Sequence, residues 1–317
     1  MQDDIMKPRV FIHTNNRQMV GALLSAHSFR SRSRHADKFD VEIINHADQP
    51  FFARHDGQLY LRGGNKIPWR NDDLQSFTPL RFMPPEVMGY EGKALVVDPD
   101  VFAVGDVWEL LSRDMAGKAI VCRVHTGVKR TVRGTYASSV MLLDCAKLRH
   151  WKAAEQFDAL FDFTRDYTTW MGLGYEDSAT IGEMETFWND FDHLGPETRL
   201  LHNTRRMTQP WKTGLHVDFL PVERFPLFPP FGWLMRARRQ LFGDYALLGK
   251  YKRHPDQRQE ALFWALLRDT VEAGEIDEAF LRQEMAQGHL RADALEQLPR
   301  ARTVDAVLAD LEPRRAA

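Results

Sequence analysis

The sequence has few cysteines, no long apolar run and no excess of charge of one sign. Its 317 residues include only two cysteines, Cys122 and Cys145, which lack both the paired short spacing of a zinc site and the density of a disulfide scaffold. Both are therefore predicted to be reduced residues of the core. Lys and Arg number 42 against 44 Asp and Glu, and the resulting net charge of -2 predicts no nucleic-acid partner.

The apolar runs are too short for a signal peptide or a membrane-spanning helix. The chain starts with acidic residues, and its first apolar strip covers only residues 10–12, whereas a secretory signal begins with basic residues and a longer apolar region. The uncharged strip at 225–235 is interrupted by prolines and falls short of the roughly 20 residues that cross a bilayer. These features predict a soluble, cytoplasmic protein.

What the sequence does contain is an alternation of strand and helix patterns in a chain long enough to bury a large core. Because strands that alternate with helices favour an open parallel sheet, the predicted fold class is α/β, with a mostly parallel central sheet flanked by helices. Strands are predicted at residues 9–13, 39–45, 93–97, 119–124 and 139–143, and helices at about 19–29, from Asp106 onward, and at 146–161.

Prolines punctuate the chain after Leu200, and beyond them residues 259–311 have the apolar spacing of two or three amphipathic helices. The predicted organisation is a large domain at 1–230 and a helical C-terminal extension at 231–317.

Two carboxylates one residue apart, Asp98 and Asp100, follow the apolar strand at 93–97. Open α/β sheets bind ligands at the carboxyl ends of their strands, and carboxylate oxygens are the ligands that Mg²⁺ and Mn²⁺ prefer. The triplet therefore predicts a metal site that leaves coordination positions open for a diphosphate.

In this stretch the sequence resembles the family 8 glycosyltransferases, the glycogenin and bacterial galactosyltransferase group, and their GT-A relatives. The resemblance rests on VVDPD followed by GDVWEL, on VFIHTNN near the start, on SSVMLLDCAKL at 138–148 and on HNTRRMTQPWKTG at 202–214, all in the family's order. It covers residues 9–215 and implies a GT-A, Rossmann-like fold. It also implies a metal-dependent transfer of a sugar from a nucleotide diphosphate sugar, with UDP-sugar as donor and retention of configuration.

The resemblance also implies roles for particular residues. It makes His202 the third metal ligand beside Asp98 and Asp100, with Mn²⁺ or Mg²⁺ as the cofactor. The family's lysine before Pro-Trp, which grips phosphate, is Gln209 here, so Lys212, Arg205 or Arg206 is expected to supply that charge. The residues implied to contact the nucleotide sugar are Thr14, Asn15, Asn16, Arg81, Asp98, Trp211 and Lys212.

The catalytic carboxylate is less well marked, because the family's Asp-Gln pair is absent between residues 170 and 188. The acidic candidates in this stretch are Glu176, Asp177 and Glu183, each of which also suits a solvated loop. Asn189 and Asp192 either orient the acceptor or close a turn. Ser138 and Ser139 replace the family's Asn-Ser-Gly, so the resemblance does not carry the family's sugar-hydroxyl contacts over to these positions.

Two other classes of function remain open. A catalytically silent GT-A protein that acts as a binding or scaffold module would fit the missing Asp-Gln pair. A nucleotidyltransferase also uses carboxylates and metal, but the chain lacks a Gly-rich basic loop after its first strand. The acceptor is expected to be a glycan, a lipid-linked molecule or a protein. Residues 231–258 carry seven Lys or Arg against two Asp among apolar residues, which is typical either of a solvated face or of a peripheral contact with the inner face of a membrane.

Overall fold

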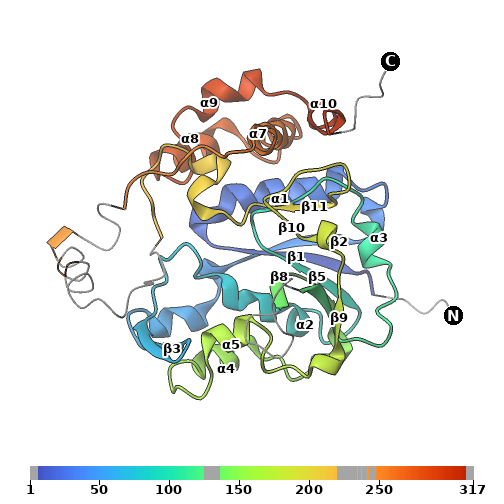
Figure 1. Ribbon diagram of the computed structural model, residues 1–317, viewed down its shortest axis with the longest axis vertical. Helices are drawn as coiled ribbons and strands as arrows, with labels where there is room; N and C mark the ends of the chain where they lie inside the picture. The colour runs from blue at the N-terminus through green and yellow to red at the C-terminus, as the bar shows by residue number, and fades with distance from the viewer. Residues whose placement is uncertain are drawn as a thin grey trace.

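The computed structural model describes residues 6–124, 136–219 and 248–311, together with the four isolated residues Leu234, Ala237, Leu241 and Phe242. A central sheet of six strands runs through the molecule, with helices on both sides (Figure 1). Its strand order is β2-β1-β5-β8-β7-β9. The bounds are Asp40–Asn45 for β2, Arg9–Thr14 for β1, Lys93–Val97 for β5, Tyr136–Asp144 for β8, Ile120–Val124 for β7 and Ile181–Glu183 for β9.

The predicted α/β architecture with a mostly parallel sheet is confirmed. Three pairings are parallel, β1 with β2, β1 with β5 and β7 with β9, while β8 runs antiparallel to both β5 and β7. The four residues Ala94, Leu95, Val96 and Val97 of β5 are fully buried, as expected for a strand covered on both faces. Burying each such valine or leucine side chain stabilises the fold by roughly 1.5–3 kcal/mol.

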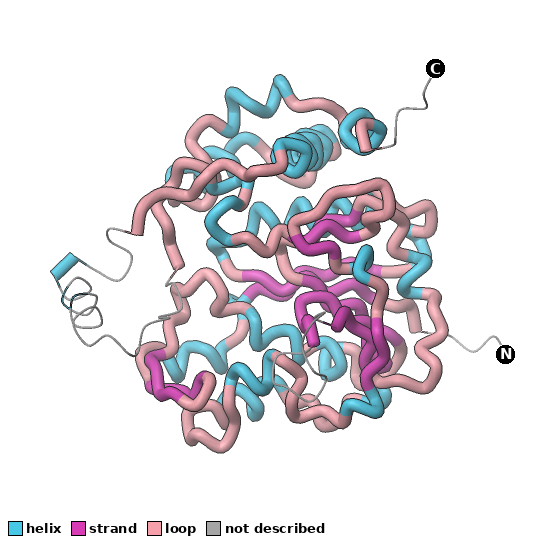
Figure 2. The backbone as a smooth tube through the Cα atoms, viewed as in Figure 1, coloured by secondary structure: helices cyan, strands magenta, loops and turns pink. Residues whose placement is uncertain are grey.

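A second, three-stranded sheet lies beside the end of β5. Its order is β10-β11-β6, with bounds Asp190–Phe191, Leu200–His202 and Val101–Ala103. A hairpin of β3 and β4, Leu59–Arg62 and Asn65–Pro68, lies apart from both sheets (Figure 2). The three-stranded sheet matters most for function because its strand β6 begins at Val101, directly after the Asp98–Asp100 triplet.

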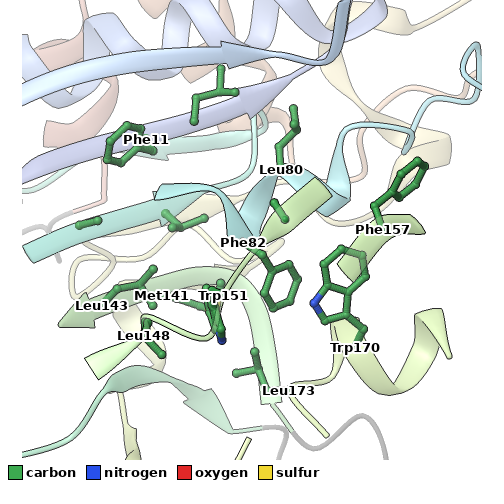
Figure 3. Packing of buried hydrophobic residues seen from close by; sticks show 14 of the residues in the cluster. Phe11, Leu80, Phe82, Met141, Leu143, Leu148, Trp151, Phe157, Trp170 and Leu173 are labelled. Carbon is green, nitrogen blue, oxygen red and sulfur yellow. The ribbon is translucent and has the colours of Figure 1, made fainter. Parts of the chain in front are cut away.

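Each face of the central sheet has its own apolar cluster. Helix α1, Met19–Ser31, packs Ala22, Ala26 and Phe29 against one face. The short helices α2, Pro84–Val87, α4, Ala153–Asp158, and α5, Tyr167–Met171, cover the other face (Figure 1). On that face the aromatic rings of Phe11, Phe82, Trp151 and Trp170 are buried together (Figure 3).

The C-terminal helices form a layer outside α1 (Figure 1). Leu262 and Leu266 of α7 share a hydrophobic cluster with Val20 and Leu24 of α1. The bounds are Gln257–Glu272 for α7, Glu278–Ala286 for α8, Ala294–Gln297 for α9 and Val304–Ala309 for α10. Four helices thus follow residue 256 in the described part of the chain, where two or three were predicted. Pro230 lies outside the described residues, so the domain boundary stays a prediction.

The helix predicted at 146–161 is wrong. The chain makes a 3-10 turn at Cys145–Lys147, and within residues 148–161 only α4 is helical. Trp151 is fully buried, and the next residue, Lys152, has a non-helical backbone at φ -128° and ψ 89°. Packing of the Trp151 ring therefore interrupts the helix that the apolar spacing suggested. The helix expected from Asp106 onward is the short helix α3, Trp108–Leu111.

The prediction for the cysteines is confirmed: Cys122 and Cys145 are free and buried, and burial raises the pKa of each thiol to about 12. Among the described residues no helix has the length and apolar character to cross a bilayer.

Candidate active site

The pairing of β6 with β11 brings His202 next to the Asp98–Asp100 triplet. In this antiparallel pair His202 lies opposite Val101, and the backbone N–H of Asn203 donates to the carbonyl of Asp100 at 3.0 Å. The Nε2 atom of His202 is 3.3 Å from Asp100 Oδ1 and 3.9 Å from Asp98 Oδ2. One ligand atom from each of the three residues lies within 4.8 Å of the others, which is a spacing that one divalent cation can span.

Helix α1 holds this turn in place. A Cβ atom at Gly21 would lie 2.6 Å from the Pro99 carbonyl oxygen, so only glycine allows α1 to pack this closely on the triplet. The Ser25 hydroxyl donates to the carbonyl of Val101 at 2.6 Å, and the Ser28 hydroxyl accepts from the N–H of Ala103 at 2.9 Å. The helix therefore fixes both the turn and the strand that aligns His202.

The ring of His202 is oriented by Asn189. The Asn189 amide donates to Ser139 Oγ at 3.2 Å, which directs its oxygen to His202 Nδ1 at 2.8 Å. His202 thus donates from Nδ1 and presents Nε2 to the carboxylates, the arrangement that metal-binding histidines use. Burial alone would lower the pKa of His202, but Asp100 and Asp98 outweigh it and raise that pKa. A cation would compete with the proton for Nε2.

Asp98 is held as a carboxylate by two neighbours. His13 Nε2 donates to Asp98 Oδ1 at 2.6 Å, and Arg81 donates to both oxygens, from Nε at 3.0 Å and from Nη2 at 2.5 Å. Burial favours the protonated acid, yet Arg81 and His13 hold the pKa of Asp98 below its ordinary value. Burial lowers the pKa of His13 itself. Asp98 is therefore ionised and fixed in position.

The three residues open into a pocket of about 560 Å³. Asp98 and Asp100 are the carboxylates among its lining residues in the described part of the chain. Arginine side chains also line the pocket, and the remaining polar groups come from five parts of the chain. The polar lining consists of Gln18, Arg62, Gln75, Arg81, Asp98, Asp100, Tyr136, Ser138, Ser139, Tyr167, Thr168, His202, Thr204, Arg206 and Gln209.

The predicted contacts near the first strand do not line this pocket. Thr14 is fully buried, and its hydroxyl donates to the Asn15 carbonyl at 3.1 Å. The Asn15 amide donates to the carbonyls of Asp73 and Leu74, and Asn16 accepts from Asn45. These residues fix the loop after β1, while Gln18, which the sequence did not single out, reaches the pocket.

Trp211 and Lys212 are likewise outside the pocket lining. Trp211 is fully buried against Phe102 and Phe263, where it anchors the C-terminal helices. The Lys212 ammonium is fully buried 2.5 Å from Asp218 Oδ2. Burial and this ion pair keep the charge of Lys212 away from the pocket, and a contact of Lys212 with a diphosphate stays a prediction of the resemblance.

The acidic candidates do not face the pocket either. Glu176 accepts from Trp151 Nε1 at 2.9 Å and pairs with His150 at 2.8 Å. Asp177 accepts from the N–H of Ala179 in a turn, and Glu183 is exposed on β9. A catalytic role for these three carboxylates is therefore not supported. Asn189 orients His202, and Asp192 holds the Thr204–Arg205 turn through hydrogen bonds to both residues.

Comparison with protein-family models and with curated proteins gives no match. Among solved structures, the chain is similar to the galactosyltransferase LgtC in complex with donor and acceptor sugar analogues, at 16% identity and a TM-score of 0.44, covering 64% of this chain and 89% of that one. It is similar to the apo glycosyltransferase GlyE of Streptococcus pneumoniae TIGR4, at 15% identity and a TM-score of 0.47, covering 86% of this chain and 64% of that one. The chain is also similar to mouse xyloside xylosyltransferase 1, at 13% identity and a TM-score of 0.40, covering 62% of this chain and 97% of that one. At these values the comparison assigns no family to the chain.

Proposed function

We propose that the protein is a metal-dependent glycosyltransferase of the GT-A type that takes a sugar from a nucleotide diphosphate donor. The observation that carries this proposal is the convergence of Asp98, Asp100 and His202 at the edge of one pocket, with Nε2 of His202 directed at the carboxylates. A UDP-sugar donor and retention of configuration are proposed on the resemblance of the motifs alone.

The residues fit a hard or borderline divalent cation. Two carboxylates and one imidazole suit Mn²⁺ or Mg²⁺. The Gln209 side chain is only 1% exposed and lines the same pocket, and its carbonyl oxygen has no hydrogen-bond partner among the residues that the structure describes. When bound, such a cation supplies positive charge to diphosphate oxygens. The protein's own groups set the ligand geometry: Asn189 orients His202, and Arg81 with His13 fixes Asp98.

The proposal predicts that a nucleotide diphosphate sugar stabilises the protein only when a divalent cation is present. A thermal-shift panel of UDP, GDP, CDP and ADP sugars with Mn²⁺ is the test, since a ligand at about 100 times its Kd adds about 2.7 kcal/mol to the free energy of unfolding. We expect one base to stand out, and chelation with EDTA to abolish the shift. Absence of a shift with every donor would favour the silent binding module instead.

The acceptor is proposed to be a glycan, a lipid-linked molecule or a protein, and residues 231–258 to contact an anionic membrane surface. Most of residues 231–247 lie outside the described part, but the described Leu234, Leu241 and Phe242 are 65%, 75% and 64% exposed. Apolar side chains among basic residues suit the surface of an anionic bilayer.

The membrane proposal predicts that the protein floats with anionic liposomes and that raising the salt concentration weakens this binding, because salt screens the charges. Liposomes of neutral lipid are the control in the same flotation assay. Equal recovery with neutral and anionic liposomes would contradict the proposal.

A further inference from the structure

Among the basic residues expected to supply positive charge to the donor's diphosphate, Arg81, Lys212 and Arg205 are engaged elsewhere. Arg81 uses Nε and Nη2 on Asp98 and Nη1 on Ser138 Oγ at 2.9 Å. Lys212 is buried against Asp218, and the exposed Arg205 lies 3.8 Å from Asp192 Oδ2. Gln209, at the position where the resemblance leads one to expect lysine, is neutral.

Arg206 is placed differently from these residues. It lies on the loop between His202 and Gln209, and both ends of that loop reach the same carboxylate: His202 Nε2 is 3.3 Å from Asp100 Oδ1, and Gln209 Nε2 donates to Asp100 Oδ2 at 3.3 Å. The loop therefore wraps the metal site, and the Arg206 side chain lines the pocket within it.

The guanidinium of Arg206 is held without being neutralised. It lies over the Phe219 ring, 5.3 Å from the ring centroid, and it forms no ion pair with a carboxylate in the described part of the chain. Burial lowers the pKa of Arg206, and the nearby charges of Asp73 and Asp100 partly offset this effect, but arginine stays protonated at physiological pH. Its forked N–H donors are thus available to an anion in the pocket.

We propose that Arg206 binds the diphosphate of the donor beside the metal site and stabilises the negative charge that develops on it, an inference that rests on the proposed transferase function. In this step the bond between the anomeric carbon and the diphosphate oxygen breaks, and its electron pair stays on that oxygen. The acceptor hydroxyl oxygen forms the new bond to the anomeric carbon, and its proton passes to the released diphosphate. A planar guanidinium matches two phosphate oxygens at once, which a neutral Gln209 cannot do.

Arg62 is the competing cation, because it lines the same pocket. Its Nη1 donates to the Tyr60 hydroxyl at 3.2 Å, and its guanidinium lies 4.8 Å from the centroid of the Tyr167 ring. Arg62 comes from the β3–β4 hairpin, whereas Arg206 shares its loop with His202. The geometry therefore favours Arg206 over Arg62 as the residue that contacts the diphosphate beside the metal site.

The test is titration calorimetry with Mn²⁺ and two probes, UDP and inorganic pyrophosphate, the second of which carries no base. Arg206→Gln is expected to weaken both probes about 10- to 100-fold, the value of a hydrogen bond to a charged group. Arg206→Lys is expected to recover part of the loss. Arg205→Gln, the exposed neighbour, is the matched control and is expected to match the wild type, and affinity for Mn²⁺ alone is expected to be unchanged in all three variants.

Transfer rates with the donor found by thermal shift provide the second measurement, and the kcat of Arg206→Gln is expected to fall about 100-fold. If the wild type binds the probes but Arg206→Gln binds them equally well, or if Arg62→Gln alone causes the whole loss, the Arg206 assignment is overturned while the transferase proposal stands. If the wild type binds no diphosphate in the presence of Mn²⁺, both proposals fall.

Discussion

Asp100→Asn and His202→Ala proteins are expected to keep their fold and to lose metal-dependent sugar transfer by about a thousandfold or more. The size of this loss follows from the several kcal/mol by which a bound cation stabilises the negative charge of the leaving diphosphate. Both side chains lie at the pocket rather than in the apolar clusters, so their loss removes ligand atoms without opening a cavity in the core. The measurements are transfer rate and Mn²⁺ affinity, with thermal unfolding as a check on folding.

Two further variants sharpen this prediction. His193→Ala removes an exposed histidine that pairs with Asp190 at 2.9 Å, and it is expected to leave Mn²⁺ affinity unchanged. Asn189→Ala removes the acceptor for His202 Nδ1, and a loss of metal affinity of about 10- to 100-fold is expected from such a supporting residue. Full activity of Asp100→Asn in the presence of a chelator would show that no cation acts at this site.

Five of the six strands of the central sheet could be predicted, because each is a short run rich in apolar residues. The sixth, β9, was not predicted, since Ile181 is the one residue of its three with an apolar side chain. The residues of β5 are apolar and fully buried, and the sequence placed both β5 and the carboxylates that follow it. The helix at 146–161 could not be rejected from the sequence, since Trp151 suits an apolar helix face as well as a buried ring between elements. Packing decided between the two.

The three proposed metal ligands were predictable to different degrees. Asp98 and Asp100 follow from local pattern, whereas His202 depends on the long-range pairing of β6 with β11, which only the resemblance of the motifs suggested. The roles of His13 and Asn189 depend on contacts between segments more than 10 residues apart, 85 positions for His13 with Asp98 and 13 for Asn189 with His202. An imidazole or an amide gives no local signal of such a partner.

Basic residues in the 205–212 segment illustrate the same limit. Charge and position made Lys212, Arg205 and Arg206 equivalent candidates, but their burial differs: Lys212 is fully buried, Arg205 is exposed and Arg206 is intermediate. A lysine that stays charged in the interior needs a carboxylate to compensate for its desolvation. That carboxylate, Asp218, comes after a turn whose course the sequence does not reveal.

Lys212→Met is expected to destabilise the protein by about 3 kcal/mol or more, because it leaves Asp218 largely buried without its closest cation. The remaining partners are the Tyr251 hydroxyl, which donates to Asp218, and Arg17 Nη1 at 3.4 Å. These contacts soften the loss but do not replace a buried ammonium at 2.5 Å. Urea unfolding measures the change, and Lys252→Met, at an exposed lysine, is the matched control.

The pH dependence separates this structural role from a role in catalysis. Burial alone would raise the pKa of Asp218, but Lys212 and Tyr251 lower it, so Asp218 contributes stability above its unfolded pKa of about 4 and loses it as pH falls through the lower folded value. Lys212→Met is expected to reduce this loss on acidification, and Lys212→Met combined with Asp218→Leu to recover much of the stability. Affinity of the folded Lys212→Met protein for UDP with Mn²⁺ is expected to match the wild type, because the ammonium does not line the pocket. A large loss of UDP affinity without loss of stability would instead indicate that Lys212 contacts the donor.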